Sequence, residues 1–351
     1  MRRFQGNKPT MRDVGRLAGV SYATASRVLS GNGYASPETR AKVLKVASEI
    51  GYKANGPARS LRKNSSTALA LIVTDIDNPF YSAVAEGVIQ GTRKTGLRVI
   101  IFSSNDNPKL EREGLEMCME ERVAGIIAVP TSDCWIEAIQ FGIPVVFVDR
   151  LAPKVSVDAV LVDNFRGAYD AVSYLLTLGH RRIGMVAGPS DTTTGARRRE
   201  GYEAALKERG IPFNPHLVQE VPFLGKAAED AVKSLVRVSP PPTAIFAANN
   251  IIAEACFRVA KSHNLKIPTD ISLVAFDDVP WMSLVSPEIT AIFQPMRELG
   301  HQASSLIEKR LRDDASPTSS KPQTIILPTR LLIRESCSPP GKRAMSPTER
   351  R

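Results

Sequence analysis

From residue 67 onward, short apolar segments alternate with longer amphipathic ones, and this pattern restricts the fold more than any other feature of the chain. Apolar runs predict strands at 68–74, 98–104, 125–129 and 144–148, with helices at 80–95, 108–121 and 134–141 between them. A second series begins near Asp158, with strands at 182–187, 243–248 and 271–276 and helices at 167–178, 194–209, 226–238 and 250–263. Such alternation specifies parallel sheets with helices on both faces. The two series therefore predict two doubly wound lobes, with a ligand at the carboxyl ends of the strands.

The first 66 residues differ from this body in charge. They contain thirteen Lys and Arg residues and three acids, a formal charge of +10, which is also the charge of the whole chain. The body is therefore neutral overall. A small basic unit attached to a neutral globular body is typical of a protein that binds nucleic acid.

Helix signals in this basic head are closely spaced. Thr10 and Asp13 form a capping-box pattern that predicts a helix of about two turns. Gly19 stands where such a helix needs a left-handed residue after its end. Ser21 can cap a second helix over 22–30, and the short link between the helices allows only a sharp corner. Two short helices joined in this way predict a helix-turn-helix.

A third predicted helix begins with Ser36 as its cap and ends at Gly51, and the three apolar stripes can close one small core. The second helix can then enter a major groove with its N-terminal residues against base edges. An Arg in that position can make a bidentate contact to guanine. In the alternative interpretation the motif is only a packing solution, and the charge concentration disfavours this. The predicted base-reading side chains are Tyr22, Ala23, Ser26 and Arg27.

The segment from Asn55 to Lys63 leaves two interpretations open. Asn55 can cap a short helix, but the segment offers little apolar surface, so the helix alone is marginal in water. In one interpretation the segment folds on DNA, with Leu61 wedged into a minor-groove step. In the other it is a flexible linker without DNA contact. The residues alone do not separate the two.

At 11–14, 18–29, 36–40, 51–52 and 58–61 the chain resembles the lactose, galactose and purine repressor family of bacterial transcription regulators, the LacI type. The resemblance continues through the body to about residue 336 and implies a periplasmic-binding-protein-like body of two lobes. Two departures are Ser30 for the family's usual Asn and Ala54 for its usual Pro. With the helix pattern, the resemblance predicts DNA contacts at Tyr22, Ala23, Ser26, Arg27, Ser36, Thr39, Asn55, Ala58 and Leu61.

In the body, polar side chains cluster where predicted strands end, at 74–81, 149–150, 249–250 and 276–278. Carboxylates, amides and an Arg together with aromatic rings suit a polyhydroxyl ligand, which needs bidentate hydrogen bonds and apolar faces to stack on. For single residues such as Asn78 and Asp278, capping of the next helix is an equally good interpretation.

The family resemblance narrows this cluster. Arg198 lies in an Arg-x-x-Gly-Tyr pattern and Asp277 in Phe-Asp-Asp, whereas Phe223 lies in a loop with few landmarks. Asn250 replaces an acid that is usual in the family, so a fixed carboxylate count cannot identify the effector. The predicted effector-binding residues are Asp75, Phe80, Asp149, Arg198, Phe223, Asn249 and Asp277.

Other classes of protein are disfavoured. No apolar run approaches the roughly 18 residues of a membrane span, and no secretory signal follows the basic N-terminus. The four histidines are scattered, no GxSxG or HExxH motif exists, and 188–195 lacks the Gly-Lys-Ser/Thr ending of a phosphate loop. The cysteines, Cys118, Cys134, Cys256 and Cys337, lie far apart. We expect no enzyme activity, metal or cofactor.

The expected organisation is a helix-turn-helix domain at 1–54, a hinge helix and linker at 55–66, an effector-binding and dimerisation domain at 67–337, and a disordered tail at 338–351. The expected function is that of a cytoplasmic regulator, a repressor, which binds near-palindromic double-stranded operator DNA as a homodimer or a higher assembly. A small-molecule effector, a sugar or sugar derivative, is expected to control its operator affinity. The sequence does not separate a sugar or sugar acid from a nucleobase. The alternative from another class is a solute-binding carrier protein with the same body fold.

Overall fold

The computed structural model describes residues 9–30, 34–52, 66–223, 227–312 and 321–341. Within it, the chain divides into two compact units, Met1–Ser66 and Thr67–Arg351. The predicted hinge residues Asn55, Ala58 and Leu61 lie outside the described residues.

The head is built from three helices, α1 (Met11–Ala18), α2 (Tyr22–Ser30) and α3 (Pro37–Glu49). The capping box of Thr10 and Asp13 is formed at the start of α1, and Gly19 ends the helix with a φ of 64°. The Ser21 hydroxyl accepts the Thr24 amide at 3.0 Å. The predicted helix-turn-helix is therefore confirmed. Its core contains the buried side chains Val14, Ala18, Val28, Val43 and Ala47.

The first lobe of the body is a six-stranded sheet in the order β11-β5-β4-β3-β1-β2, in which all the described pairs are parallel. In β1 the side chains alternate, so that Leu69 and Leu71 join one core and Ala70 and Ile72 the other. Helices therefore cover both faces. The strands are β1 (Ala68–Val73), β2 (Arg98–Ser103), β3 (Gly125–Ala128), β4 (Val145–Val148), β5 (Asp158–Val162) and β11 (Thr324–Leu327), and the helices are α5 (Pro79–Thr92), α6 (Pro108–Glu120), α7 (Ile136–Gln140) and α12 (Met296–Arg312).

The second lobe repeats this plan in the order β12-β10-β9-β8-β6-β7, with β12 antiparallel to β10. Helices α8 and α9 pack against each other, and α10 packs against α11. The strands are β6 (Ile183–Ala187), β7 (Val218–Glu220), β8 (Ala244–Ala247), β9 (Ser272–Phe276), β10 (Thr290–Phe293) and β12 (Arg330–Leu332), and the helices are α8 (Asn164–Thr177), α9 (Thr193–Glu208), α10 (Ala227–Val236) and α11 (Asn250–Ser262). The short helices η1 (Pro215–Leu217) and η2 (Pro280–Ser283) also belong to this part of the chain. Two parallel-stranded α/β lobes with a helical head confirm the predicted fold class.

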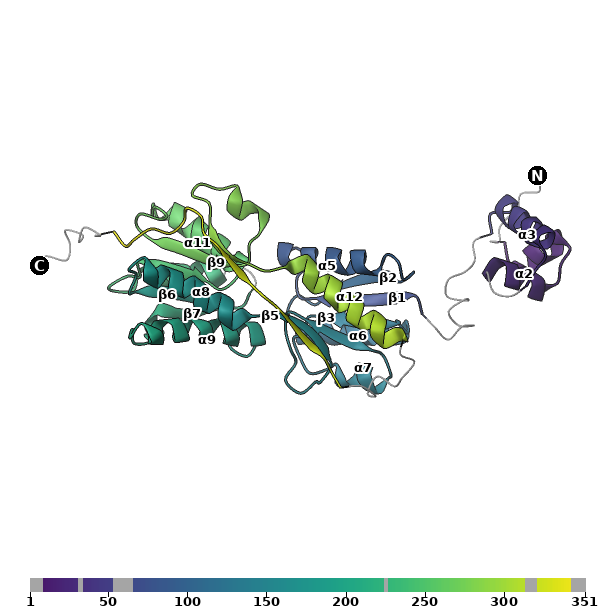
Figure 1. Ribbon diagram of the computed structural model, residues 1–351, viewed down its shortest axis with the longest axis horizontal. Coiled ribbons are helices and arrows are strands. Elements are labelled where there is room, and N and C mark those ends of the chain that lie inside the picture. The colour runs from purple at the N-terminus through teal and green to yellow at the C-terminus, as the bar shows by residue number, and fades with distance from the viewer. Residues whose placement is uncertain (1–8, 31–33, 53–65, 224–226, 313–320, 342–351) are drawn as a thin grey trace, which may run out of the picture. The chain divides into compact units, whose positions relative to one another are not determined.

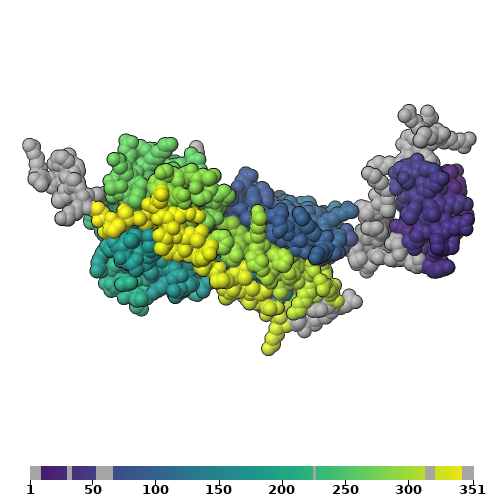
Figure 2. Space-filling model, turned by 45° about the horizontal axis from the view of Figure 1, so that its top comes forward, coloured from purple at the N-terminus to yellow at the C-terminus, as the bar shows by residue number. Residues whose placement is uncertain are grey.

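Within the described residues the chain crosses between the lobes three times, from β5 to α8, from β10 to α12 and from β11 to β12 (Figure 1). Figure 2 shows the last segment, in yellow, on the surface along both lobes. The strand and helix pattern in the sequence ends at residue 276, so β10, α12, β11 and β12 were not predicted. Strands β11 and β12 are short and only partly buried, and they therefore lack the continuous apolar run of a central strand.

The predicted disordered tail begins at residue 338, but Ser338 is bound to the second lobe. Its amide donates to the Ser272 hydroxyl at 3.1 Å, and its carbonyl oxygen lies 2.9 Å from Nε2 of the buried His180. Residues 342–351 lie outside the described residues. Among the described residues, no helix has both the length and the apolar character needed to cross a bilayer.

Helices α5 and α12 approach so closely that glycines are needed at the contact. A Cβ atom at Gly300 would overlap the carbonyl oxygen of Val84, and one at Gly87 would overlap that of Arg297. Because both obstacles are backbone atoms, they cannot move without shifting a helix.

We expect Gly300→Ala to lower the free energy of unfolding by about 1–3 kcal/mol through overpacking. The expected sign is informative because Gly→Ala within a helix otherwise stabilises it by up to ~1 kcal/mol. Urea denaturation followed by circular dichroism measures the change, with the exposed Ser305→Ala in the same helix as control. A stability equal to or above that of the parent protein would contradict the close contact.

Candidate functional site

Two buried aspartates occupy equivalent places in the two lobes. Asp149 follows β4 and Asp277 follows β9, each at the carboxyl end of its strand and only 4% and 3% exposed. Both have a φ of 69°, in the left-handed region that costs a non-glycine residue about 1 kcal/mol or more. The surrounding structure holds this strained backbone at both strand ends, and strain of this kind is concentrated at ligand sites.

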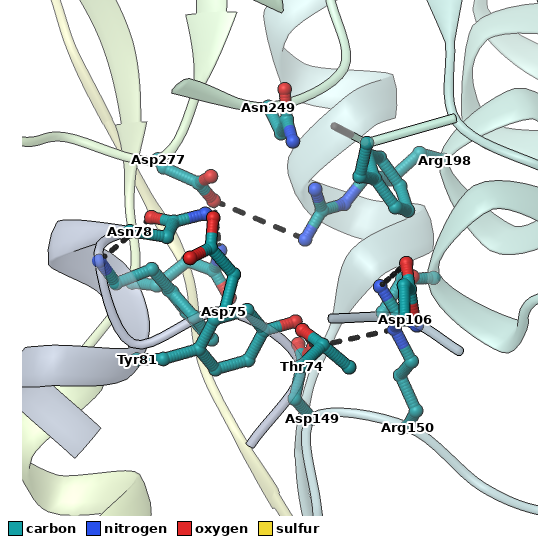
Figure 3. A pocket seen from close by; sticks show the side chains of 14 residues that line it. Thr74, Asp75, Asn78, Tyr81, Asp106, Asp149, Arg150, Arg198, Asn249 and Asp277 are labelled. Atoms are coloured by element: carbon teal, nitrogen blue, oxygen red, sulfur yellow. Dashed lines mark hydrogen bonds and ion pairs between the residues drawn. The ribbon is translucent and has the colours of Figure 1, made fainter. Parts of the chain in front are cut away.

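Arg198, on α9, is held by contacts on several sides, of which Figure 3 shows the ion pair with Asp277. Its Nε donates to Oδ1 of Asn164 at 2.7 Å, another guanidinium nitrogen donates to the carbonyl oxygen of Ala248 at 2.5 Å, and the guanidinium carbon lies 3.8 Å from the centre of the Phe276 ring. The remaining nitrogen is 4.0 Å from Oδ1 of Asp277. Burial lowers the pKa of the guanidinium, and the nearby carboxylates oppose this shift.

On the first-lobe side, Arg150 is paired with Asp106 and only 3% exposed. Its guanidinium donates to the two Asp106 carboxylate oxygens at 2.6 and 3.4 Å, and its Nε lies 3.9 Å from Oδ2 of Asp149. The Tyr81 hydroxyl donates to the same Asp149 oxygen at 3.2 Å. Burial raises the pKa of the Asp149 carboxyl, although the Arg150 and Arg198 guanidiniums offset part of this rise.

These groups line one pocket between the lobes, with about 410 Å³ of empty space that is partly open to solvent. All seven effector-binding residues predicted from the sequence line it. Their binding role stays a prediction, but the structure brings them together. The pocket is also lined by Thr74, Asn78, Tyr81, Asp106, Arg150, Thr194 and Gln294, which were not in the predicted set.

Several predicted residues also have structural partners. Oδ1 of Asn249 accepts the Ile252 amide at 2.8 Å and so caps α11, while Oδ1 of Asp75 accepts the Asp77 amide at 3.0 Å. Phe80 packs edge-on against Tyr81, with 4.9 Å between the ring centres.

Of two loop residues considered from the sequence, Phe223 lines the pocket and Asp278 does not. The Phe223 ring lies under the Arg150 guanidinium, at 5.3 Å. Asp278 does not line the pocket; it accepts hydrogen bonds from the Arg334 guanidinium at 2.7 and 3.0 Å.

Some of the pocket residues missing from the predicted set lie in segments that the sequence pattern had marked, and others do not. Asn78, Tyr81 and Arg150 lie within polar segments that the sequence already marked at strand ends. Gln294 follows β10, a strand that the pattern did not reveal, so no signal pointed to it. Its side chain donates a hydrogen bond to Oδ1 of Asp277.

Four buried polar atoms in the pocket have no hydrogen-bond partner among the described residues. They are Oδ1 of Asp149, Nε of Arg150, Oγ1 of Thr194 and Oε1 of Gln294. Buried polar groups in native proteins are almost always hydrogen-bonded. Four unpartnered atoms on residues that line one pocket are therefore consistent with a polar ligand.

In the head, the predicted base-reading residues lie on the outer face of α2. Tyr22, Ala23 and Arg27 are exposed, and Ser26 is half-buried. Ser36 caps α3: its hydroxyl accepts the Thr39 amide at 3.2 Å and lies 2.8 Å from the Thr39 hydroxyl. The DNA contacts of these residues stay predictions.

Comparison with known proteins agrees with both units. Residues 10–55 match the model "Bacterial regulatory proteins, lacI family", and residues 172–337 match a periplasmic binding protein-like domain. The chain is 33% identical over 339 residues to the transcriptional regulator DegA of Bacillus subtilis, covering 95% of this chain and 99% of DegA. The chain belongs to the lacI family.

Further lacI-family relatives extend over nearly the whole chain. The ribose operon repressor of Haemophilus influenzae is 31% identical over 93% of this chain and 98% of its own length. Among solved structures, a complex of the transcriptional regulator CelR with cellobiose has a TM-score of 0.70 at 27% identity, covering 93% of this chain and 99% of that one. This chain is accordingly a DNA-binding transcription regulator, and these relatives are regulators rather than enzymes.

We expect Arg198→Met to lower the free energy of unfolding by about 3 kcal/mol, because it leaves buried acceptors and the Asp277 carboxylate without their cation. The neighbouring Arg197→Ala is the matched control: Arg197 is 56% exposed, and its pair with Glu200 should contribute less than about 1 kcal/mol. Denaturant titration at neutral pH measures both. Equal decreases in the free energy of unfolding for the two variants would show that the buried Arg198 stabilises the fold no more than the exposed Arg197.

Proposed function

We propose that this regulator represses transcription in the cytoplasm, binds a near-palindromic double-stranded operator as a homodimer, and responds to a small, neutral, hydroxyl-rich effector bound between its lobes. The observation that carries the effector proposal is the cluster of four unpartnered buried polar atoms in the pocket. The set contains two acceptors, one donor and one hydroxyl that can do both. A ligand with several hydroxyl groups matches all of them.

The charge balance of the pocket favours a neutral effector. Four carboxylates line it, those of Asp75, Asp106, Asp149 and Asp277, against the two guanidiniums of Arg150 and Arg198. Arg150 is already paired with Asp106, and Arg198 lies against Asp277. An acidic ligand would therefore bring a further negative charge beside unneutralised carboxylates in a buried site. We infer a sugar rather than a sugar acid, in line with the cellobiose held by CelR and the ribose operon of the Haemophilus relative.

A dimer follows from how the head reads DNA. One chain offers one recognition helix, so a near-palindromic operator needs two related heads. In the proposal Tyr22, Ala23 and Arg27 contact base edges, and Leu61 of the hinge inserts into the minor groove. Strand β1 begins at Ala68, directly after the hinge in the sequence, so a change in lobe arrangement reaches the hinge through covalent connection. Effector and operator affinities are then linked reciprocally.

The alternative function, a solute-binding carrier, accounts for the body but not for the head. Residues 10–55 match the DNA-binding family, and relatives that share both parts are transcription regulators. We therefore do not favour a carrier.

A thermal-shift screen of neutral sugars, sugar acids and purines tests the effector class. We expect a neutral sugar to raise the unfolding midpoint, because ligand that binds only the folded state stabilises it by mass action. Asp149→Asn should reduce this shift strongly, whereas Asp133→Asn, on the surface beside Lys154, should not. A larger shift with a sugar acid than with any neutral compound would overturn the charge argument.

Arg27→Ala tests the DNA-reading helix. On an operator selected from random duplexes by the parent protein, we expect the variant to lose about 1–3 kcal/mol of binding free energy and its preference at one base position. A fluorescence titration at fixed salt measures the affinity, with the exposed Arg209→Ala of the second lobe as control. Unchanged base preference would remove Arg27 from the reading set.

A further inference from the structure

One buried amide connects the two lobes at the edge of the pocket. Asn250 is the first residue of α11 in the second lobe, and its Nδ2 donates to Oδ1 of Asn78 in the first lobe at 3.0 Å. The same nitrogen donates to Oδ2 of Asp277 at 2.9 Å, and the Asn250 backbone amide also donates to this oxygen at 3.0 Å. The exposed fractions are 2% for Asn250, 7% for Asn78 and 3% for Asp277. Figure 3 draws Asn78 and Asp277, the two side chains to which Asn250 donates, on the same side of the pocket.

The surrounding groups fix the orientation of both amides. Oδ1 of Asn78 must face the helix it caps, because it accepts the Phe80 amide at 3.0 Å. The Asp277 carboxylate can only accept hydrogen bonds when ionised. Asn250 therefore has to present its nitrogen. One Nδ2 hydrogen is donated to Asn78 in the first lobe and the other to Asp277 in the second.

An aspartate could not replace this amide in the bridge. At position 250 it would face the Asp277 carboxylate and the Asn78 oxygen with no hydrogen to donate, and two carboxylates at such a distance repel unless one binds a proton. Yet an acid in the first turn of a helix is normally favourable, because it interacts with the positive end of the helix dipole. The N-terminus of α11 alone would thus accept Asp equally well. Asn is required by the two acceptors that its Nδ2 reaches, Asp277 in the same lobe and Asn78 in the first lobe.

We propose that Asn250 is a positioning residue that bridges the lobes through Asn78 and, before any effector binds, biases the protein toward the lobe arrangement seen here. This inference rests on the proposed effector-controlled function only for its biological meaning, since the bridge itself involves no ligand. A second cross-lobe bond, from the Leu151 amide to the Thr193 hydroxyl at 3.1 Å, is exposed, so water can replace it. The buried bridge has no such substitute. Its loss should shift the balance of open and closed lobes about two- to tenfold.

Hydrogen–deuterium exchange of the full chain, without effector or operator, tests the bridge. For each variant, amide exchange is measured in the lobe that does not contain the substitution. Exchange caused only by the loss of a helix cap at the substituted residue is thereby excluded. We expect Asn250→Asp and Asn250→Ala to raise exchange at 74–82 about two- to tenfold, and Asn78→Ala to do the same at 250–256. The double variant Asn78→Ala/Asn250→Ala should add little to either single change, as expected for two halves of one interaction.

Asn107→Ala is the matched control, because Asn107 caps α6 within the first lobe by accepting the Lys109 amide at 2.9 Å. It should leave exchange at 250–256 unchanged. If Asn250→Asp alters exchange only in its own lobe, or if the single effects simply add, Asn250 serves α11 alone and the proposal is overturned. Circular dichroism shows whether each variant is folded. If one of the three single variants does not fold, the other two still test the bridge. Because no sugar is used, failure of the effector screen leaves this result unaffected.

Discussion

The burial of charge between the lobes is the constraint on which the rest of the body depends. Asp149, Asp277, Arg150 and Arg198 are each at most 4% exposed, and a buried ion without partners is very unfavourable. The fold meets this requirement from both lobes, through Asp106 and Tyr81 on one side and Asn164 and the Ala248 carbonyl on the other. Among these four side chains, Oδ1 of Asp149 and Nε of Arg150 remain without a hydrogen bond. The side chains that keep these charges partnered are therefore also those that we propose to bind the effector.

This arrangement explains why carboxylates can stand at strained backbone positions. Asp149 and Asp277 both have a left-handed φ, and both carboxylates lie at the pocket, where Tyr81 donates to Asp149 and Asn250 donates to Asp277. A glycine would adopt the backbone more easily but would supply no acceptor. The fold thus tolerates local strain at both strand ends, where the side chain has a use that outweighs the cost.

Much of this could be predicted from the sequence, and the failures have physical causes. Central strands such as β1, β4 and β9 are buried on both faces and therefore appear as continuous apolar runs. The polar residues that follow them, Asp149 and Asp277 among them, could be found because a strand end fixes where they lie. Gln294 was not found because it follows β10, a short apolar run that lies beyond residue 276, where the predicted pattern of strands and helices ends. The bridge of Asn78 and Asn250 joins residues 172 positions apart, and only the sequence's departure from the family's acid hinted at it.

The partner of α5 at the glycine contact, α12, is synthesised late. Helix α12 and strand β11 belong to the first lobe, yet they are translated after almost all of the second lobe. Domains generally fold as the chain emerges from the ribosome, N-terminal parts first. The basic head can therefore be complete while the lobe that follows it in the sequence still lacks α12 and β11. Until residues 296–327 are made, a nascent chain has the surface for reading DNA but not the finished body that regulates it.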